Sequence, residues 1–221
     1  MNPQLNLRAM RLVSLALCSL FFANCASGPP KANPNQTGAY EAVHVNPYPP
    51  GTYAHFKASA NYPKTYSIYR DEALLAATSP SNSEVIIDRD LQRGLLLNNG
   101  KVAMDYPVST GKGAFPTPSG SFTILEKKRD GKRSNLYGKI YDAEGNVVNS
   151  DADSTSDTIP EGGKFVGASM PYWMRITWTG VGMHQGRVPR YPASHGCIRT
   201  YYKAVSTVYS KVDKGTPVVV R

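Results

Sequence analysis

The alternation of apolar and polar positions predicts a mainly β structure for the C-terminal part of the chain. Short apolar runs occur at 84–88 and 94–100. Asn99-Gly100, inside the second run, supplies the backbone freedom that a tight hairpin turn needs. The apolar residues after this turn alternate with polar ones: Val102, Met104, Tyr106 and Val108. This period of two predicts a strand that buries one face.

The same pattern continues toward the C-terminus. Further strands are expected at 121–128, 174–178 and 216–220. Before the last strand, apolar residues recur with helical spacing: Ala204, Val205, Val208, Tyr209 and Val212. A single helix is therefore expected to flank a mainly β domain. Residues 127–163 interrupt the pattern with a basic run followed by an acidic run, which is typical of a solvated loop or hairpin.

The N-terminus has the order of charged and apolar residues that is typical of a secretory signal peptide. Arg8 and Arg11 precede the apolar run 12–23, which is too short for a permanent transmembrane helix. Cys25 stands where bacterial lipoprotein signals place the acylated cysteine, a pattern that this segment resembles. We therefore expect a signal peptide over 1–24 and an exported, periplasmic protein anchored by lipid. The alternative is a buried N-terminal helix.

A tether and an extension follow this signal. Residues 25–39 are rich in Pro, Asn, Ser and Gly and lack an apolar period, which indicates a tether. Residues 40–82 form an N-terminal extension with a helix expected near 71–77, and the sequence assigns no task to it. The remaining residues, 83–221, form the main domain.

Composition and charge fit one folded domain in anionic surroundings. Of the 221 residues, 41% are hydrophobic, which is enough for one core. The net charge of +9 favours cell-wall polymer, lipid headgroups or nucleic acid without choosing among them. Residues 151–157 lack the glycine and glutamate of a calcium loop, and 109–113 lack two required residues of a phosphate loop. Neither calcium nor nucleotide binding is expected.

Cys197, within the segment ASHGCIRT at 193–200, is the one cysteine beyond residue 25. Cys18 leaves with the signal peptide and Cys25 is expected to be acylated, so Cys197 has no evident disulfide partner. An unpaired thiol in an oxidising compartment favours a reactive role. A disulfide between Cys25 and Cys197, or a buried cysteine that serves as a small hydrophobe, are the structural alternatives.

The residues near this thiol are those that acyl transfer requires. A nucleophilic thiol needs a base, and the donors of an oxyanion hole must stabilise the charge that develops on the attacked carbonyl. His184 and His195 are candidate bases. Gly196 permits a tight turn in which successive amides could converge on a negative charge. Arg199 could raise the thiolate fraction and bind a substrate carboxylate.

Six short motifs occur along the main domain in a characteristic order. They are PVSTGK (107–112), TPSGSFTI (117–124), MPYWMRI (170–176), GVGMHQG (180–186), SHGCIR (194–199) and GTPV (215–218). Together they resemble the L,D-transpeptidase family of bacterial cell-wall enzymes over about residues 83–221. The resemblance implies an L,D-transpeptidase-like β-sandwich or barrel with one flanking helix near the C-terminus and a long inserted loop.

The resemblance also assigns catalytic roles by position. Cys197 matches the nucleophile, and His184 matches the base. The backbone carbonyl of Gln185 would orient the imidazole of that base. The amides of His195, Gly196 and Cys197 would form the oxyanion hole.

The same resemblance implies a substrate pocket and a reaction. The residues that would shape the pocket are Ser194, His195, Arg199, Tyr172 and Trp173. Cys197 would attack the L,D bond between the third residue of a peptidoglycan tetrapeptide stem and its terminal D-alanine. An amine would then take the acyl group from the thioester, forming a cross-link or attaching a protein. No metal or organic cofactor is required, and nucleic acid is not an expected partner.

The expected partners are peptidoglycan, a wall-attached protein acceptor, and the membrane through a lipid on Cys25. Three other functions stay open. If water takes the acyl group, the same fold acts as an L,D-carboxypeptidase or endopeptidase. His184, His195 and Cys197 could instead ligate zinc in a wall hydrolase, although their spacing differs from common zinc motifs. The chain could also be a non-catalytic, wall-binding lipoprotein that uses its basic surface.

Overall fold

A computed structural model describes residues 44–221, which form one unit. The expected signal peptide, the expected tether with Cys25 and the start of the extension lie outside the described residues. No helix within 44–221 has the length and apolar character needed to cross a membrane.

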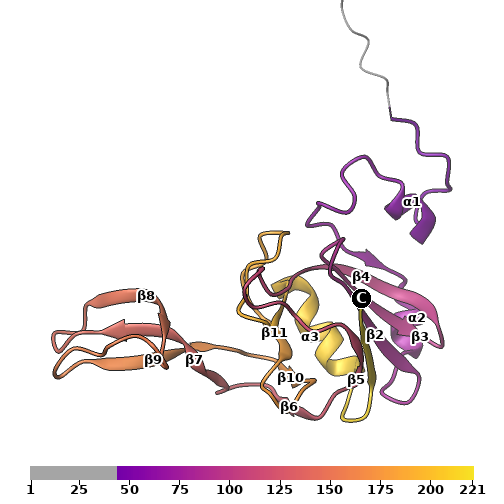
Figure 1. Ribbon diagram of the computed structural model, residues 1–221. Coiled ribbons are helices and arrows are strands. Elements are labelled where there is room, and N and C mark those ends of the chain that lie inside the picture. The colour runs from indigo at the N-terminus through magenta and orange to yellow at the C-terminus, as the bar shows by residue number, and fades with distance from the viewer. Residues whose placement is uncertain (1–43) are drawn as a thin grey trace, which may run out of the picture. The chain divides into compact units, whose positions relative to one another are not determined.

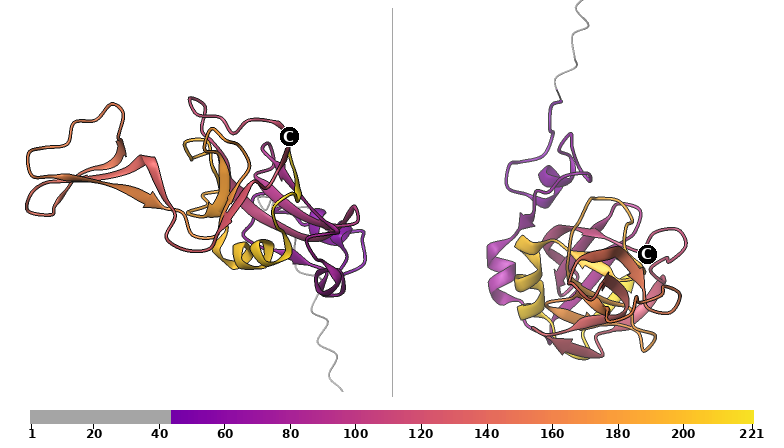
Figure 2. Two further views of the ribbon diagram at one scale, coloured as in Figure 1. Left: turned by 90° about the horizontal axis from the view of Figure 1, so that it is seen from below. Right: turned by 90° about the vertical axis from the view of Figure 1, so that its left-hand side faces the viewer.

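Ten strands form the main sheet (Figure 1). Nine of them follow the order β5-β13-β2-β3-β4-β12-β11-β10-β6, and β1 pairs with β4. Their bounds are β1 (Tyr69–Arg70), β2 (Ser83–Asp88), β3 (Arg93–Asn98), β4 (Lys101–Ser109), β5 (Gly120–Thr123), β6 (Glu126–Lys128), β10 (Trp173–Arg175), β11 (Gly182–Gln185), β12 (Ile198–Thr200) and β13 (Pro217–Val220). The sheet curls on itself, as the right-hand view of Figure 2 shows. The expected mainly β class is confirmed.

The hairpin between β3 and β4 has the turn that the sequence predicts. Asn99 and Gly100 both adopt positive φ, at 46° and 78°, in the two-residue connection. The burial of β4 differs from the prediction, however, because residues on both of its faces are buried from Ala103 onward. The second face, which includes Asp105, is covered by the N-terminal extension, whose tyrosines contact that carboxylate.

The extension contains α1 (Tyr53–Lys57) and α2 (Glu72–Ala77). The second helix confirms the element expected near 71–77, and the side chain of Asp71 caps it by accepting from the amide of Leu74. Tyr53 and Tyr62 donate hydrogen bonds to Asp105 at 2.9 and 3.1 Å. The extension is thereby joined to the second face of β4.

The C-terminal elements also match their predictions. Helix α3 (Tyr202–Lys211) buries Ala204, Val205 and Val208, and β13 pairs with β2 and β5 in the main sheet. The single strand expected at 121–128 is instead two strands. The chain changes partners at residues 124–125, where one amide bonds to Thr216 and the next to Arg175. As a result β5 pairs with β13, whereas β6 pairs with β10.

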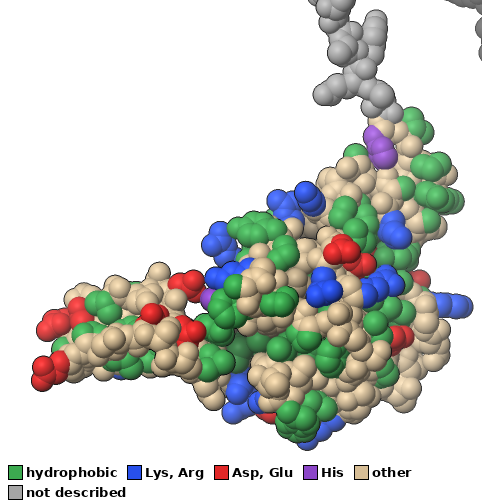
Figure 3. Space-filling view, viewed as in Figure 1, with side chains coloured by type: hydrophobic (Ala, Val, Ile, Leu, Met, Phe, Trp, Pro, Cys, Tyr) green, Lys and Arg blue, Asp and Glu red, His purple; other side chains and the backbone are tan. Residues whose placement is uncertain are grey.

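The interruption expected as a loop or hairpin is a small antiparallel sheet. It consists of β7 (Arg133–Tyr141), β8 (Val147–Asp153) and β9 (Lys164–Ser169), in the order β8-β7-β9. We call residues 132–169 the insert. Strands β7 and β8 form the hairpin, and β9 adds a third strand. Acidic side chains gather on its surface in Figure 3, in agreement with the solvated acidic run.

Candidate active site

Cys197 lies directly before β12, next to the parallel strand β11 that carries His184. Its thiol forms no disulfide with any described residue, and it donates a weak hydrogen bond to the carbonyl of Gly180 at 3.7 Å. Burial raises the pKa of this thiol. The amide of Gly182 and the nearby positive charges, with Arg199 first among them, act in the opposite direction. The resting group is therefore a neutral thiol.

His184 is buried and held in a defined tautomer. Its Nδ1 lies 2.8 Å from the backbone oxygen of Gln185, the contact that the family resemblance suggested. Because a carbonyl oxygen only accepts, Nδ1 carries the proton and Nε2 is left as an acceptor. Burial lowers the pKa of His184 to about 4. The imidazole is therefore neutral at pH 7 and can receive a proton.

Ser194 organises the backbone between His195 and Cys197. Its buried hydroxyl donates to the carbonyl of Cys197 and accepts from the amide of Gly196 at 3.2 Å. Gly196 has φ of +107°, a conformation that side chains disfavour. The expected role of Ser194 in the pocket is thus accompanied by a structural one. The amide of Gly196 is engaged within the loop, which leaves those of His195 and Cys197 as candidate oxyanion donors.

Residues 110–117 hold this loop from the other side. The amide of Ser194 donates to the carbonyl of Thr110 at 3.0 Å, and the hydroxyl of Thr117 donates to the carbonyl of Gly196 at 2.8 Å. The buried amide side chain of Gln92 bonds to both the backbone and the hydroxyl of Thr110. Gln92 has no motif around it, so no pattern in the sequence indicates this role.

The ring of His195 is enclosed by two aromatic rings. Tyr137 of the insert stacks on it, with centroids 3.9 Å apart and planes within 13°, and Phe115 lies at 4.9 Å. Burial, together with the charge of Lys112, lowers the pKa of His195. Tyr137 falls in the segment expected to be solvated, and no pattern in the sequence indicates this contact.

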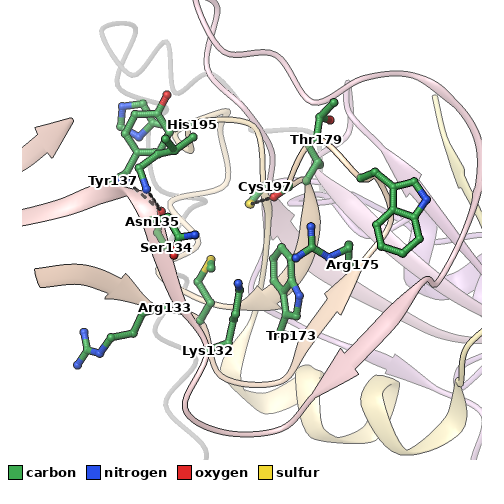
Figure 4. Close-up of a pocket in the computed structure, with 15 residues that line it drawn as sticks. Lys132, Arg133, Ser134, Asn135, Tyr137, Trp173, Arg175, Thr179, His195 and Cys197 are labelled. Carbon is green, nitrogen blue, oxygen red and sulfur yellow. Dashed lines mark hydrogen bonds between the residues drawn. The ribbon is translucent and has the colours of Figure 1, made fainter. Parts of the chain in front are cut away.

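Cys197 lines two cavities. One, which we call the imidazole cavity, is lined by His184, Ser194, His195 and Arg199 among others. The other, the thiol cavity, is shown in Figure 4 and includes Lys132, Trp173 and Arg175 in its wall. The sulfur therefore lies where a substrate in either cavity can reach it. His184 and Cys197 share the imidazole cavity.

Tyr172 and Trp173, both expected in the substrate pocket, lie in different surroundings. Trp173 is buried in the wall of the thiol cavity, with its ring centroid 6.3 Å from that of His184. Tyr172 lies elsewhere, which corrects the expectation that it contacts substrate beside Trp173. It packs on Tyr209 of α3 and lines a separate depression with Lys127. Its φ of +56° turns the backbone between the two residues.

Arg199 is opposite His184 in the β11–β12 pairing and lines the imidazole cavity. Its positive charge acts on both His184 and Cys197. The alternative zinc site has no geometric support, because no three His, Cys, Asp or Glu side chains among residues 44–221 are grouped as metal ligands. His184, His195 and Cys197 thus share a site without surrounding a common ligand position.

The geometry agrees with what comparisons with known proteins show. Residues 82–220 match the family model of the YkuD L,D-transpeptidase catalytic domain. The chain is 30% identical over 122 residues to a protein named probable L,D-transpeptidase 3 from Mycobacterium tuberculosis. That match covers 52% of this chain and 38% of the relative, so the chain matches well under half of that protein.

Solved L,D-transpeptidases are also similar to this chain. One from Enterococcus faecium is 28% identical, with a TM-score of 0.46, and the match covers 64% of this chain and 50% of that chain. One from Xylanimonas cellulosilytica is 22% identical, with a TM-score of 0.48, and the match covers 65% of this chain and 62% of that chain.

Proposed function

Because the chain belongs to the L,D-transpeptidase catalytic domain family, we propose that it is a cysteine-dependent L,D-transpeptidase that acts on peptidoglycan tetrapeptide stems. Cys197 is the nucleophile and His184 the base. The acyl donor is the third residue of the stem, and the leaving group is its terminal D-alanine. The acceptor is an amine of another stem or of a wall-attached protein.

One observation carries this proposal. The imidazole of His184 is neutral, is held by the carbonyl of Gln185 through Nδ1, and shares a cavity with the thiol of Cys197. This combination of nucleophile, base and orienting group is the arrangement that acyl transfer by a thiol requires. A buried structural cysteine would need neither a neighbouring imidazole base nor a carbonyl that orients it.

The chemistry proceeds in two halves. As the sulfur of Cys197 attacks the carbonyl carbon, its proton passes to Nε2 of His184, and the amides of His195 and Cys197 stabilise the oxyanion. The C–N bond then breaks, the imidazolium returns its proton to the departing amine of D-alanine, and a thioester remains. In the second half, an amine attacks the thioester carbonyl and gives its proton to His184. The C–S bond then breaks, and the imidazolium returns the proton to the sulfur, which regenerates the thiol.

Mass spectrometry on a defined disaccharide tetrapeptide tests this assignment. The wild-type chain should release D-alanine, show an acyl adduct on Cys197, and form a dimer linked between the third residues of two stems. Cys197→Ala should lower D-alanine release by about 10³-fold or more. A Cys197→Ala variant that keeps the activity contradicts the proposal, and release of D-alanine with water as sole acceptor identifies a carboxypeptidase instead.

We also propose that the protein is exported and anchored in the periplasm through a lipid on Cys25. The support is the charged and apolar order of residues 1–24 and the position of Cys25. In bacteria that express the full chain, Cys25→Ser should move the protein from the membrane to the soluble periplasmic fraction. Membrane retention of this variant contradicts the anchor.

A further inference from the structure

The wall of the thiol cavity is positively charged. Three cationic side chains line it, Lys132, Arg133 and Arg175, and none of its lining residues is Asp or Glu. His195 also lines this cavity, and burial lowers its pKa, which favours the neutral imidazole. An anionic group of a ligand would therefore be attracted into this cavity.

Among the described residues, Lys132 is the one cation of the three that both lacks an ion pair and points toward the sulfur. Arg175 forms an ion pair with Glu126 at 2.9 Å. Arg133 donates to the carbonyl of Gly167 at 2.6 Å, and its side chain points away from the sulfur in Figure 4. Lys132 takes part in no ion pair among residues 44–221, and its side chain points into the cavity toward Cys197.

Lys132 is also well positioned. It lies at the base of the insert, where its carbonyl accepts from the amide of Met170 at 2.9 Å. Its ammonium lies 5.7 Å from the ring centroid of the buried Trp173, in cation–π range. Lys132 and Cys197 line the same cavity, and the charge of Lys132 acts to lower the pKa of the thiol.

The proposed substrate carries an anion close to the bond that is broken. In a tetrapeptide stem, the terminal D-alanine follows the attacked carbonyl directly, so its carboxylate lies about 4–5 Å from the reacting carbon. A cation in the wall beside the sulfur is within reach of that carboxylate during the attack. In a donor extended by another residue, or capped at its C-terminus, the same position would hold a neutral amide.

We propose that Lys132 is a specificity-determining residue that binds the free C-terminal carboxylate of the acyl donor and restricts the enzyme to stems in which one D-amino acid follows the scissile bond. The inference rests on the proposed L,D-transpeptidase function and names the group that its donor site recognises. Arg199 lines the imidazole cavity and not the thiol cavity, so it remains available to a group bound there.

The test compares two donors: a disaccharide tetrapeptide that ends in D-alanine, and the same compound ending in D-alaninamide. Acylation of Cys197 in the full chain is followed by mass spectrometry. The wild type should react about 10- to 100-fold faster with the acid, the range expected for a hydrogen bond to a charged group. Lys132→Met should remove this preference by slowing the acid donor alone, whereas Lys132→Arg should keep most of it.

Lys164→Met is the control, because it removes an exposed positive charge of the insert that lines neither cavity, and it should retain the wild-type preference. The amide donor reports whether each variant is folded and reactive. A wild type that acylates equally with both donors overturns the inference while leaving the transpeptidase function intact. The inference is also overturned if the Lys132→Met variant is acylated more slowly by both donors alike, or if it keeps the preference for the acid donor. Absence of any adduct on wild-type Cys197 would instead contradict the proposed function itself.

Discussion

Tyr137 and His195 are 58 positions apart in the sequence, yet their rings stack with centroids 3.9 Å apart. Tyr137 belongs to β7 of the insert, and His195 lies two residues before Cys197. Both line the two cavities that meet at the thiol. The stack therefore connects the insert to the loop that contains the proposed nucleophile.

Removing this stack should slow the reaction. Tyr137→Ala should lower kcat/KM for the tetrapeptide donor by about 2- to 10-fold, the equivalent of one aromatic pair, and Tyr137→Phe should be close to wild type. Steady-state release of D-alanine measures both. Val148→Ala, at an exposed position of β8, is the control for general damage to the insert. Equal rates for Tyr137→Ala and wild type would show that the stack has no role in the reaction.

The pH dependence of kcat/KM should reflect the neutral imidazole. Burial lowers the pKa of His184 to about 4, so the ring is neutral above that pH and protonated below it. Only the neutral form accepts the thiol proton, and activity should therefore fall as the pH decreases through about 4. A pH profile of initial rates at low donor concentration checks this. An acidic limb near 6.5, the value of an exposed histidine, would contradict this assignment.

The buried ion pair between Arg93 of β3 and Asp105 of β4, which the extension contacts, should contribute to stability. Their side chains are fully buried with Nε and Oδ1 2.6 Å apart, and the guanidinium also donates to the carbonyls of Thr65 and Ser67. Arg93→Met leaves the carboxylate buried without its counter-ion and should lower the free energy of unfolding by about 3–5 kcal/mol. Urea denaturation measures this.

Arg221→Met is the matched control for that experiment. Arg221 pairs with Asp88 at 3.4 Å, but its side chain is 60% exposed. Loss of a solvated pair should lower the free energy of unfolding by about 1 kcal/mol or less. Similar losses in the two variants would mean that the buried pair contributes no more than a surface one.

The extension should also restrain the segment between His184 and Cys197. The hydroxyl of Tyr66 donates to the carbonyl of Val188 at 2.9 Å, and Arg190 lies over the same ring at 4.5 Å. Tyr66→Phe removes this hydrogen bond and keeps the ring. Amide hydrogen exchange in residues 186–192 should become about 2- to 10-fold faster, as expected for one hydrogen bond. Tyr48→Phe, at an exposed tyrosine, should leave this exchange unchanged.

The elements that depend on local residue order were predictable. The Asn99-Gly100 turn, helix α3 and strand β13 follow from side-chain periodicity and from the backbone freedom of a few residues. Cys197 and His184 could be proposed as nucleophile and base because each lies in a short contiguous motif. The carbonyl that contacts His184 belongs to its neighbour in the sequence, so that contact was also accessible.

Contacts between distant segments required the tertiary structure. The burial of both faces of β4 depends on an extension more than 40 residues upstream that packs on Asp105. The positions of Tyr137 and Lys132 depend on how the insert folds back on the loop of Cys197. Tyr172 and Trp173 are adjacent in one motif, yet a positive φ sends them to different surroundings.

The sequence by itself determined the mainly β class, the hairpin turn, the C-terminal helix and the identities of the thiol and imidazole, because these depend on periodicity and on short contiguous motifs. Only the tertiary structure decided which aromatic and cationic side chains surround the thiol. Pairing register and packing between remote segments select those neighbours, and a side-chain pattern along one strand carries no information about the segment that will cover it.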